Sequence, residues 1–555
     1  MERLFKTHIT RKNLEIDPLW DFCTIDTNGT KGELIKMIVP ACWESQPNLA
    51  SYRGKALYSK KIILGGNVRV VFKGVSHTAN IYLDGKFIKY HYNAYTEFDV
   101  ILKNIAYGEH LLEVQVDNSF HQESALHVEN DYYSYGGITR PVLIEQLGDT
   151  YIKQLHFTPS KGENLWKAQI KTTIVNLSEE VKTMKLHILV GDESALPSEE
   201  LILAPNSESV IEKSYEILSA EEYSIENPRL YYLKAIIKEK GQPVDDFIDR
   251  VGFREIKIQD KDILLNGKKL HLKGFNRHED YAEFGCAIPL QAMYRDIEIL
   301  KDLGSNCVRT CHYPNDERFL DLCDEYGIVV WEEAHARGLS EEQMKHKNFE
   351  KQSSHCISEM IENHYNHPCI FTWGILNECA SHTDYGVGCY EKQYALMREL
   401  DKSRPLTSAS CHFGNDKCLG LLDIVSFNIY PGWYFDEPAK EHLKRLQEWI
   451  ATTDGNNKPL IISEIGAGAV YGFRSTNKAK WTEDFQEEIL EEQVTAVLEN
   501  KACSGVFIWQ FADCRVDNGS FYARPKSQNN KGVVDTYRRQ KLAYRKVKEI
   551  FHSIK

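Results

Sequence analysis

From about residue 255 the chain repeats one pattern, a short apolar segment followed by an amphipathic one. Helical patterns such as those of residues 290–304 and 483–500 separate most of the apolar segments. Eight β/α repeats in about 300 residues predict a (β/α)8 TIM barrel. The eight predicted strands lie at residues 270–276, 305–310, 327–334, 370–378, 406–410, 423–430, 459–466 and 503–511.

The first 254 residues have a different pattern. Segments with period-two alternation, for example 61–75 and 110–119, are separated by Gly, Asp and Asn. This pattern predicts antiparallel β-sandwiches, and the second set has the length of one immunoglobulin-like sandwich. We therefore expect a multidomain chain of all-β and α/β units, with domains at 1–147, 148–254 and 255–555.

Composition excludes several classes of protein. The formal net charge of −13 argues against a surface for nucleic acid or an anionic membrane. The start of the sequence does not resemble a secretory signal, and no segment approaches the roughly 20 apolar residues that span a bilayer. The 14 cysteines contain no CxxC pair and are expected as reduced, buried residues. We expect a cytoplasmic protein without a metal or another cofactor.

Two glutamates follow apolar segments of the predicted barrel. Glu378 closes the fourth predicted strand, and Glu464 lies near the end of the seventh. Active sites of such barrels lie at the carboxyl ends of the strands, and paired carboxylates there serve glycoside hydrolysis. A single glutamate at such a place is more often part of an ordinary ion pair, but two in this setting favour a catalytic site.

Four segments at these strand ends, "GFNRHED", "RTCHYP", "WGILNE" and "IISEIGA", resemble the signature segments of glycoside hydrolase family 2. In the first domain, "DYYSYGGITRPV" is also similar to a family segment. The resemblance covers nearly the whole chain and implies a jelly-roll sugar-binding-like domain, an immunoglobulin-like sandwich and a TIM barrel.

The resemblance also implies catalytic roles. Glu378 would be the general acid/base and Glu464 the nucleophile of a retaining mechanism, and Asn377 would bond the 2-hydroxyl of the sugar. One departure is Cys379, because the family usually has Pro after the Asn-Glu pair. A missing Pro is expected to loosen this loop without abolishing catalysis.

The stretch "RPKSQNNKG" at 524–532 follows the eighth predicted strand and so belongs to the catalytic face. A uronic acid carries a carboxylate that needs a cation and donors when it is removed from water. Asn529 and Lys531 resemble the Asn-x-Lys motif by which β-glucuronidases of this family hold that carboxylate. Arg524 either reaches the same group or is a charge on the rim.

Further positions resemble substrate contacts of those enzymes. Trp509 is a platform for the apolar sugar face or, equally well, a buried core residue. The residues expected near the nucleophile and the uronate are Asn428, Tyr430 and Tyr434, and those expected on ring hydroxyls are His312 and, from the first domain, Asp131.

The sequence therefore predicts a retaining exo-β-glucuronidase that acts on small glucuronides or oligosaccharides. By resemblance we expect a homo-oligomer, with no nucleic-acid or membrane partner. A β-galacturonidase needs the same carboxylate clamp and remains an alternative, whereas a β-galactosidase gives no reason for the lysine. A non-catalytic carbohydrate-binding protein is a third alternative, which the two intact carboxylates disfavour.

Overall fold

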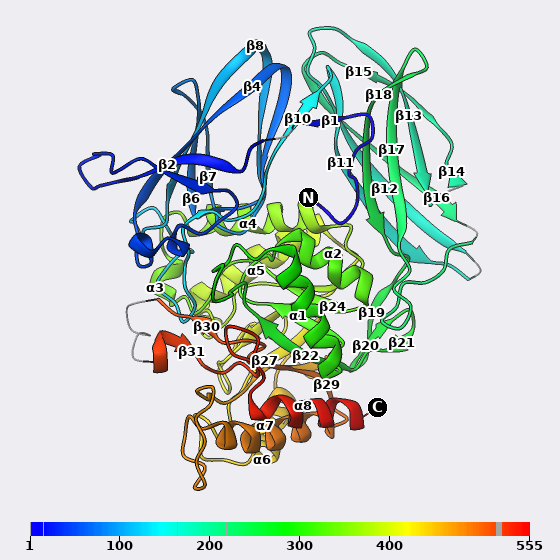
Figure 1. Ribbon diagram of the computed structural model, residues 1–555. Helices are drawn as coiled ribbons and strands as arrows, with labels where there is room; N and C mark the ends of the chain where they lie inside the picture. The colour runs from blue at the N-terminus through cyan, green and yellow to red at the C-terminus, as the bar shows by residue number, and fades with distance from the viewer. Residues whose placement is uncertain are drawn as a thin grey trace.

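The computed structural model describes residues 2–14, 16–163, 165–191, 194–217, 219–517 and 524–554. Two β-sandwiches stand side by side above a barrel that is surrounded by helices, and the C-terminal helix packs on the outside of that barrel (Figure 1). This architecture confirms the predicted combination of two all-β units and one TIM barrel.

Eight parallel strands close the barrel in the order of the sequence. Seven of them are buried at every residue, so an uninterrupted apolar run is the expected sequence pattern. The strands are β22 (Leu272–Arg277), β23 (Cys307–Thr310), β24 (Val329–Glu333), β25 (Ile370–Gly374), β26 (Leu406–Ser410), β27 (Ile424–Asn428), β28 (Leu460–Ile465) and β29 (Cys503–Ile508).

Helices surround the barrel, and two of them show why they begin or end where they do. Asp316 accepts a hydrogen bond from the Arg318 amide at the start of α2, and Gly304 ends α1 with a φ of +79°. The helices are α1 (Leu290–Leu303), α2 (Glu317–Tyr326), α3 (Glu341–Met344), α4 (Phe349–His364), α5 (Asp384–Leu400), α6 (Ala439–Ile450), α7 (Glu483–Leu498) and α8 (Leu542–Ser553).

A small antiparallel sheet closes the amino-terminal end of the barrel. It consists of β19 (Ile256–Gln259), β20 (Asp262–Leu265) and β21 (Lys268–Lys269). Its side chains Ile263 and Leu265 belong to the same apolar cluster as Trp331 and Phe507 inside the barrel. The open end of the barrel is therefore the carboxyl end of the strands.

The jelly-roll sandwich has longer strands than the sequence predicted. A strand was expected to begin near residue 110, but β8 begins at Phe98 and runs through this position, because its pairing with β4 absorbs the irregularity near Ile105 as register shifts. The strands of this unit are β1 (Lys12–Leu14), β2 (Leu19–Ile25), β3 (Ile35–Ile38), β4 (Lys55–Phe72), β5 (Val75–Ser76), β6 (Thr78–Leu83), β7 (Lys86–Tyr92), β8 (Phe98–Asp117), β9 (Gly137–Ile138) and β10 (Val142–Leu147).

The immunoglobulin-like unit packs two sheets around Trp166, Leu186, Leu233 and Phe253. One sheet contains β11 (Thr150–Lys161), β12 (Trp166–Asn176) and β16 (Ser207–Ile217). The other contains β13 (Lys182–Val190), β14 (Ser194–Ala195), β15 (Glu199–Leu203), β17 (Tyr231–Glu239) and β18 (Gln242–Val251).

The N-terminal segment ties the three units together. The Arg3 guanidinium pairs with Asp321 and Glu317 of α2, at 2.8 and 2.6 Å, and with Asp249 of β18 at 3.4 Å. Arg11 pairs with Asp245 of β18 and with Glu145 of β10, each at 2.8 Å. These buried ion pairs connect both sandwiches and the barrel.

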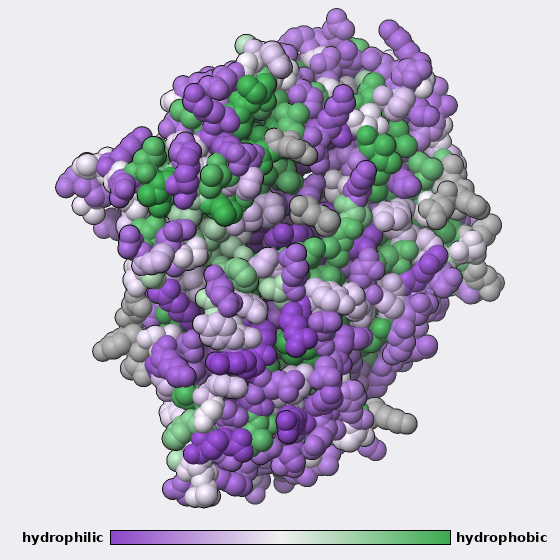
Figure 2. Space-filling model, in the orientation of Figure 1, coloured by the Kyte–Doolittle hydropathy of each residue, from purple (hydrophilic) through white to green (hydrophobic). Residues whose placement is uncertain are grey.

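The face of the molecule drawn in Figure 2 is mostly hydrophilic, with groups of apolar side chains over the sandwiches. Leu34 and Ile38 of the jelly roll, for example, are 67% and 58% exposed. Among the residues that the structure describes, no helix combines the length and apolar character needed to cross a membrane.

Candidate active site

The two glutamates lie at the open end of the barrel, one on a strand and the other on a loop. Glu464 lies on β28, as predicted. The prediction that Glu378 and Asn377 end a strand is wrong, because β25 stops at Gly374. Leu376 and Glu378 have φ angles of +49° and +51°, and this left-handed backbone cannot continue a strand. The Glu378 amide instead donates to the Ala409 carbonyl at 2.9 Å, which fixes the loop to β26.

Glu464 is buried, and both of its oxygens are held. Arg309 Nη1 donates to Oε1 at 3.0 Å, and the Tyr430 hydroxyl donates to Oε2 at 2.6 Å. Burial, followed by the charge of Glu378, raises the pKa of Glu464 to about 7, although Arg309 and Tyr430 oppose the shift. The two carboxylates therefore share one electrostatic environment.

Glu378 is more accessible than Glu464. Asn428 Nδ2 donates to its Oε1 at 3.0 Å, and Arg337 Nη2 lies 3.4 Å from its Oε2. Its side chain is 18% exposed, against 5% for that of Glu464. One carboxylate is thus fixed and enclosed, and the other borders solvent.

Asn377 and His312 are buried and have polar atoms that no described residue satisfies. Asn377 Oδ1 accepts from Arg309 Nη2 at 2.7 Å, while its Nδ2 has no partner in the described part of the chain. His312 Nδ1 lies 3.0 Å from Glu333 Oε1, and its Nε2 is likewise unpartnered there. Unpaired buried polar atoms are costly unless a ligand completes them, so both residues are suited to sugar hydroxyls.

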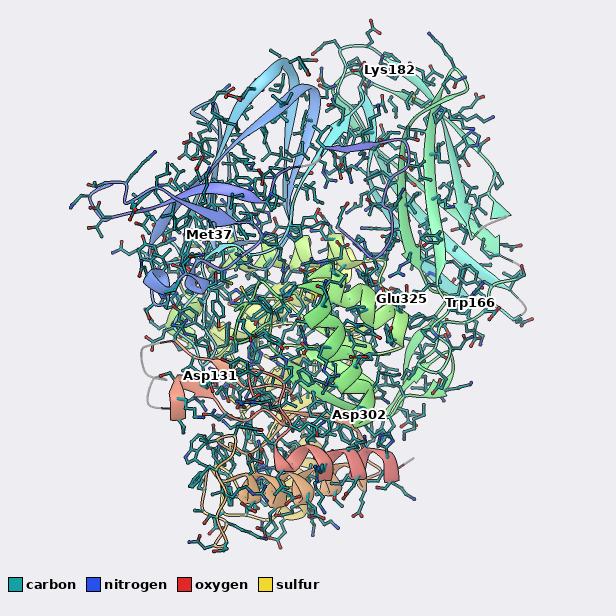
Figure 3. All side chains as sticks on the ribbon, viewed as in Figure 1. Met37, Asp131, Trp166, Lys182, Asp302 and Glu325 are labelled. Atoms are coloured by element: carbon teal, nitrogen blue, oxygen red, sulfur yellow. The ribbon has the colours of Figure 1, made fainter. Side chains whose placement is uncertain are left out.

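Asp131 extends from the jelly roll to the C-terminal segment of the barrel (Figure 3). Its Oδ2 accepts from Arg524 Nη2 at 3.1 Å and from Asn529 Nδ2 at 3.2 Å, and its Oδ1 lies 3.5 Å from Arg337 Nη2. Burial favours a raised pKa for Asp131, but the positive charges of Arg337, Arg524 and Lys531 outweigh it and lower the pKa. Asp131 is therefore an ionised acceptor that organises this corner of the site.

Lys531 is a buried cation inside an aromatic cage. The residue is 2% exposed, and its Nζ lies 5.7, 5.5 and 5.2 Å from the ring centres of Tyr430, Trp433 and Tyr434. Nζ donates to the Tyr434 hydroxyl at 3.0 Å and forms no ion pair with any residue that the structure describes. Burial lowers the pKa of Lys531, and Tyr434 opposes that shift.

The other residues predicted to contact the substrate lie in different parts of the site. Asn529 uses Nδ2 for Asp131, while its buried Oδ1 has no partner within the described residues. Tyr434 is 57% exposed and forms the rim beside Lys531. Trp509 is 2% exposed and stacks on the His312 ring at 5.1 Å, so it lines the wall behind that histidine.

The sequence analysis missed two arginines of this constellation. Arg309 joins Glu464, Asn377 and Glu333, and Arg337 joins Glu378 to Asp131. A charged residue inside the short apolar segment "NCVRTC" was an available signal for Arg309, because a buried strand arginine must be paired. No comparable pattern marks Arg337, which lies in a polar loop.

One group of side chains away from this site has donor atoms suited to a metal ion, namely Asp324, His367 and Cys369. Asp324 already contacts His367 Nδ1 at 2.6 Å and the Cys369 amide at 2.9 Å. Both of its carboxylate oxygens are therefore in use, and we interpret this group as a structural ion pair.

Comparison with known proteins identifies the family. Residues 256–555 match the family model for the TIM barrel domain of glycosyl hydrolases family 2. Residues 25–147 match the sugar binding domain of that family, and residues 150–254 match its remaining domain. The chain belongs to glycosyl hydrolase family 2 and is a glycoside hydrolase.

Individual relatives carry names of uronidases. A crystal structure of a GH2 beta-galacturonidase from Eisenbergiella tayi bound to galacturonate is 50% identical, covers 100% of both chains and superposes with a TM-score of 0.98. The beta-glucuronidase of Bacteroides fragilis is 28% identical over 95% of this chain and 79% of its own. A relative from Formosa agariphila, also named for beta-glucuronidase, is 27% identical over 80% of this chain, which spans 54% of that relative's length.

Proposed function

We propose that this protein is a retaining exo-β-uronidase, which releases a terminal hexuronic acid from β-glycosides. The substrate we favour is a β-D-galacturonide, and a β-D-glucuronide is the second candidate. The single observation that carries the uronate preference is Lys531, a buried ammonium that forms no ion pair with any residue that the structure describes.

A carboxylate at C6 of the sugar would complete this arrangement. Removing a charged ammonium from water is costly unless an opposite charge is supplied. A uronate supplies that charge, and the Tyr434 hydroxyl beside Lys531 offers a further hydrogen bond to it. A neutral hexose would leave the ammonium uncompensated, so a β-galactosidase is disfavoured.

The two glutamates support a double-displacement reaction. Glu464, held by Arg309 and Tyr430, attacks the anomeric carbon while Glu378 protonates the leaving glycosidic oxygen. Formation of the glycosyl ester removes the negative charge of Glu464. Glu378, which has given its proton to the leaving group, then accepts a proton from the attacking water, and this water releases the sugar with the starting configuration.

The free Nδ2 of Asn377 and the free Nε2 of His312 are suited to the ring hydroxyls. Arg309 donates to Asn377 Oδ1 and also to Glu464, so Asn377 lies close to the proposed nucleophile. An amide bond to the 2-hydroxyl would strengthen as positive charge develops on the sugar ring.

The preference for the galacturonide over the glucuronide rests on sequence identity to known relatives and not on a contact made by a particular residue. A relative at 50% identity over the whole chain is a beta-galacturonidase, whereas the beta-glucuronidase of Bacteroides fragilis is 28% identical. The sequence alone favoured the glucuronide, because Asn529 and Lys531 resemble the Asn-x-Lys motif of β-glucuronidases, and it left the β-galacturonidase, which needs the same clamp, as the alternative. Both substrates use the carboxylate clamp and differ in the orientation of the C4 hydroxyl.

The test compares kcat/KM on 4-nitrophenyl β-D-galacturonide, β-D-glucuronide and β-D-galactoside. We expect the galacturonide to be the best substrate and the galactoside to be the worst. A preference for the glucuronide would support the second candidate. A preference for the galactoside would overturn the role of Lys531. In a separate measurement, proton NMR of the first-formed anomer would test whether the anomeric configuration is retained.

A further inference from the structure

Two thiols meet where the jelly roll contacts the barrel. Cys42 Sγ lies 3.5 Å from Cys286 Sγ, although 244 positions separate the residues in the sequence. Cys42 is 1% exposed and Cys286 is partly exposed. A disulfide holds its sulfurs about 2.05 Å apart, so an approach of roughly 1.5 Å would join them.

The contact lies at the base of the loop that carries Asp131. On the jelly-roll side, the amides next to Cys42 donate to this segment, Trp43 to the Gly136 carbonyl and Ala41 to the Ile138 carbonyl. On the barrel side, Cys286 belongs to the loop between β22 and α1. Asp280 of that loop accepts from the Tyr135 hydroxyl at 2.9 Å. The thiol pair is therefore part of the junction that positions Asp131 over the site.

The two thiols differ in access. A cavity of about 280 Å³ borders Cys42, although that residue is 1% exposed, whereas Cys286 lies outside the lining of the cavity and is partly exposed. Burial raises the pKa of the Cys42 thiol well above its ordinary value, and Cys286 adds to that shift. The buried Cys42 is thus the poorer first nucleophile, and the partly exposed Cys286 is the one that a reagent meets.

We propose that Cys42 and Cys286 form a redox-reactive pair, which a small disulfide such as oxidised glutathione converts into a disulfide between the jelly roll and the barrel. The Cys286 thiolate attacks one sulfur of the reagent, whose disulfide bond breaks and releases one thiol. The Cys42 thiolate then attacks Cys286 Sγ and releases the second thiol. Each leaving thiolate takes up one of the two protons, so the protein loses two hydrogens and the reagent is reduced to two thiols.

The cross-link closes a loop of more than 200 residues and should stabilise the folded chain against unfolding. It also fixes the segment that precedes Trp43 to the loop before α1. The oxidised protein should therefore have a higher midpoint of thermal unfolding than the reduced protein, and dithiothreitol should reverse the change.

The experiment uses the reduced full-length protein, oxidised glutathione and peptide mapping without reduction. We expect one cross-linked peptide pair that contains Cys42 and Cys286. The Cys42→Ala variant should retain a stable glutathione adduct on Cys286, and the Cys286→Ala variant should show neither the cross-link nor an adduct on Cys42. Cys411, the exposed member of the 14 cysteines, provides the internal control for reagent activity, and Cys411→Ser should still form the cross-link.

Peptide mapping of the protein with its unmodified sequence tests the proposal even if a variant folds poorly. Glutathione on Cys411 with no Cys42–Cys286 peptide in the folded protein would overturn the proposal. A persistent adduct on Cys286 of the unmodified sequence would also overturn it, since it would mean that Cys42 cannot reach the mixed disulfide.

Discussion

At the scale of single residues, the charge on Glu464 depends on its neighbours. Its pKa of about 7 reflects burial and the charge of Glu378, while Arg309 and Tyr430 lower it. In the proposed mechanism Glu464 is the nucleophile and reacts only when it is ionised. Activity should therefore rise as the pH increases through this pKa, and it should fall on the acid side of about pH 7.

Two variants test this assignment in opposite directions. Glu378→Gln removes a negative charge and should shift the acid limb of kcat/KM to lower pH. Tyr430→Phe removes a hydrogen bond that favours the ionised form and should shift the limb to higher pH. The measurement uses a dinitrophenyl glycoside, whose leaving group needs no general acid. If the acid limb of kcat/KM stays at the same pH in both variants, ionisation of Glu464 does not determine the pH profile.

Lys531→Met tests the uronate clamp. Met keeps an apolar chain inside the aromatic cage but removes the charge, so kcat/KM on the uronide should fall by roughly two orders of magnitude or more. The galactoside should lose far less. Lys480→Met is the matched control, because Lys480 also lies over the Trp433 ring, at 4.3 Å, but is exposed. An equal loss on both substrates would contradict the proposed contact.

Sequence reasoning located residues whose identity implies chemistry, and missed those that act through geometry. Glu378, Glu464, Asn529 and Lys531 follow apolar segments in a recognisable order. Arg337 has no such pattern, because its contact with Asp131 depends on how the jelly roll meets the barrel. Contacts between residues separated by some 200 positions do not follow from local patterns.

At the scale of elements, the barrel strands were predictable and the loop after β25 was not. Strands buried on both faces leave apolar runs in the sequence. Left-handed backbone at Leu376 and Glu378 leaves no such signature, because neither residue type marks positive φ. In the jelly roll, β8 continues through Ile105 where a break between two predicted strands was expected, because a register shift against β4 absorbs the irregularity.

Gly374 at the end of β25 is a testable packing position. A β-carbon there would lie 2.1 Å from Trp331 Nε1 inside the barrel. Gly374→Ala should destabilise the protein by about 1–3 kcal/mol through overpacking, visible as a lower midpoint of urea unfolding. Gly388→Ala within α5 is the control, because no atom lies within 4 Å of its added carbon and alanine favours helix. Equal stability of the two variants would contradict this account.

At the scale of the whole molecule, stability depends on ion pairs that cross between units. Arg3→Met would leave Asp321, Glu317 and Asp249 without their shared cation in a buried setting. We expect the midpoint of thermal unfolding to fall by several degrees. The exposed Lys61–Glu109 pair gives the control, since Lys61→Ala should leave the midpoint unchanged. A similar midpoint for both variants would show that Arg3 is dispensable.

The position of Asp131 means that the candidate site is built from two domains, the jelly roll and the barrel. This carboxylate belongs to the jelly roll, yet it holds Arg524 and Asn529 of the barrel and faces Arg337. An excised barrel would keep Glu378 and Glu464, the proposed catalytic pair, but lose the acceptor that arranges these donors. Exchange of the N-terminal sandwich between relatives should therefore alter which substrate the enzyme prefers. In such enzymes, substrate specificity is then a property of the jelly roll and the barrel together and not of the barrel alone.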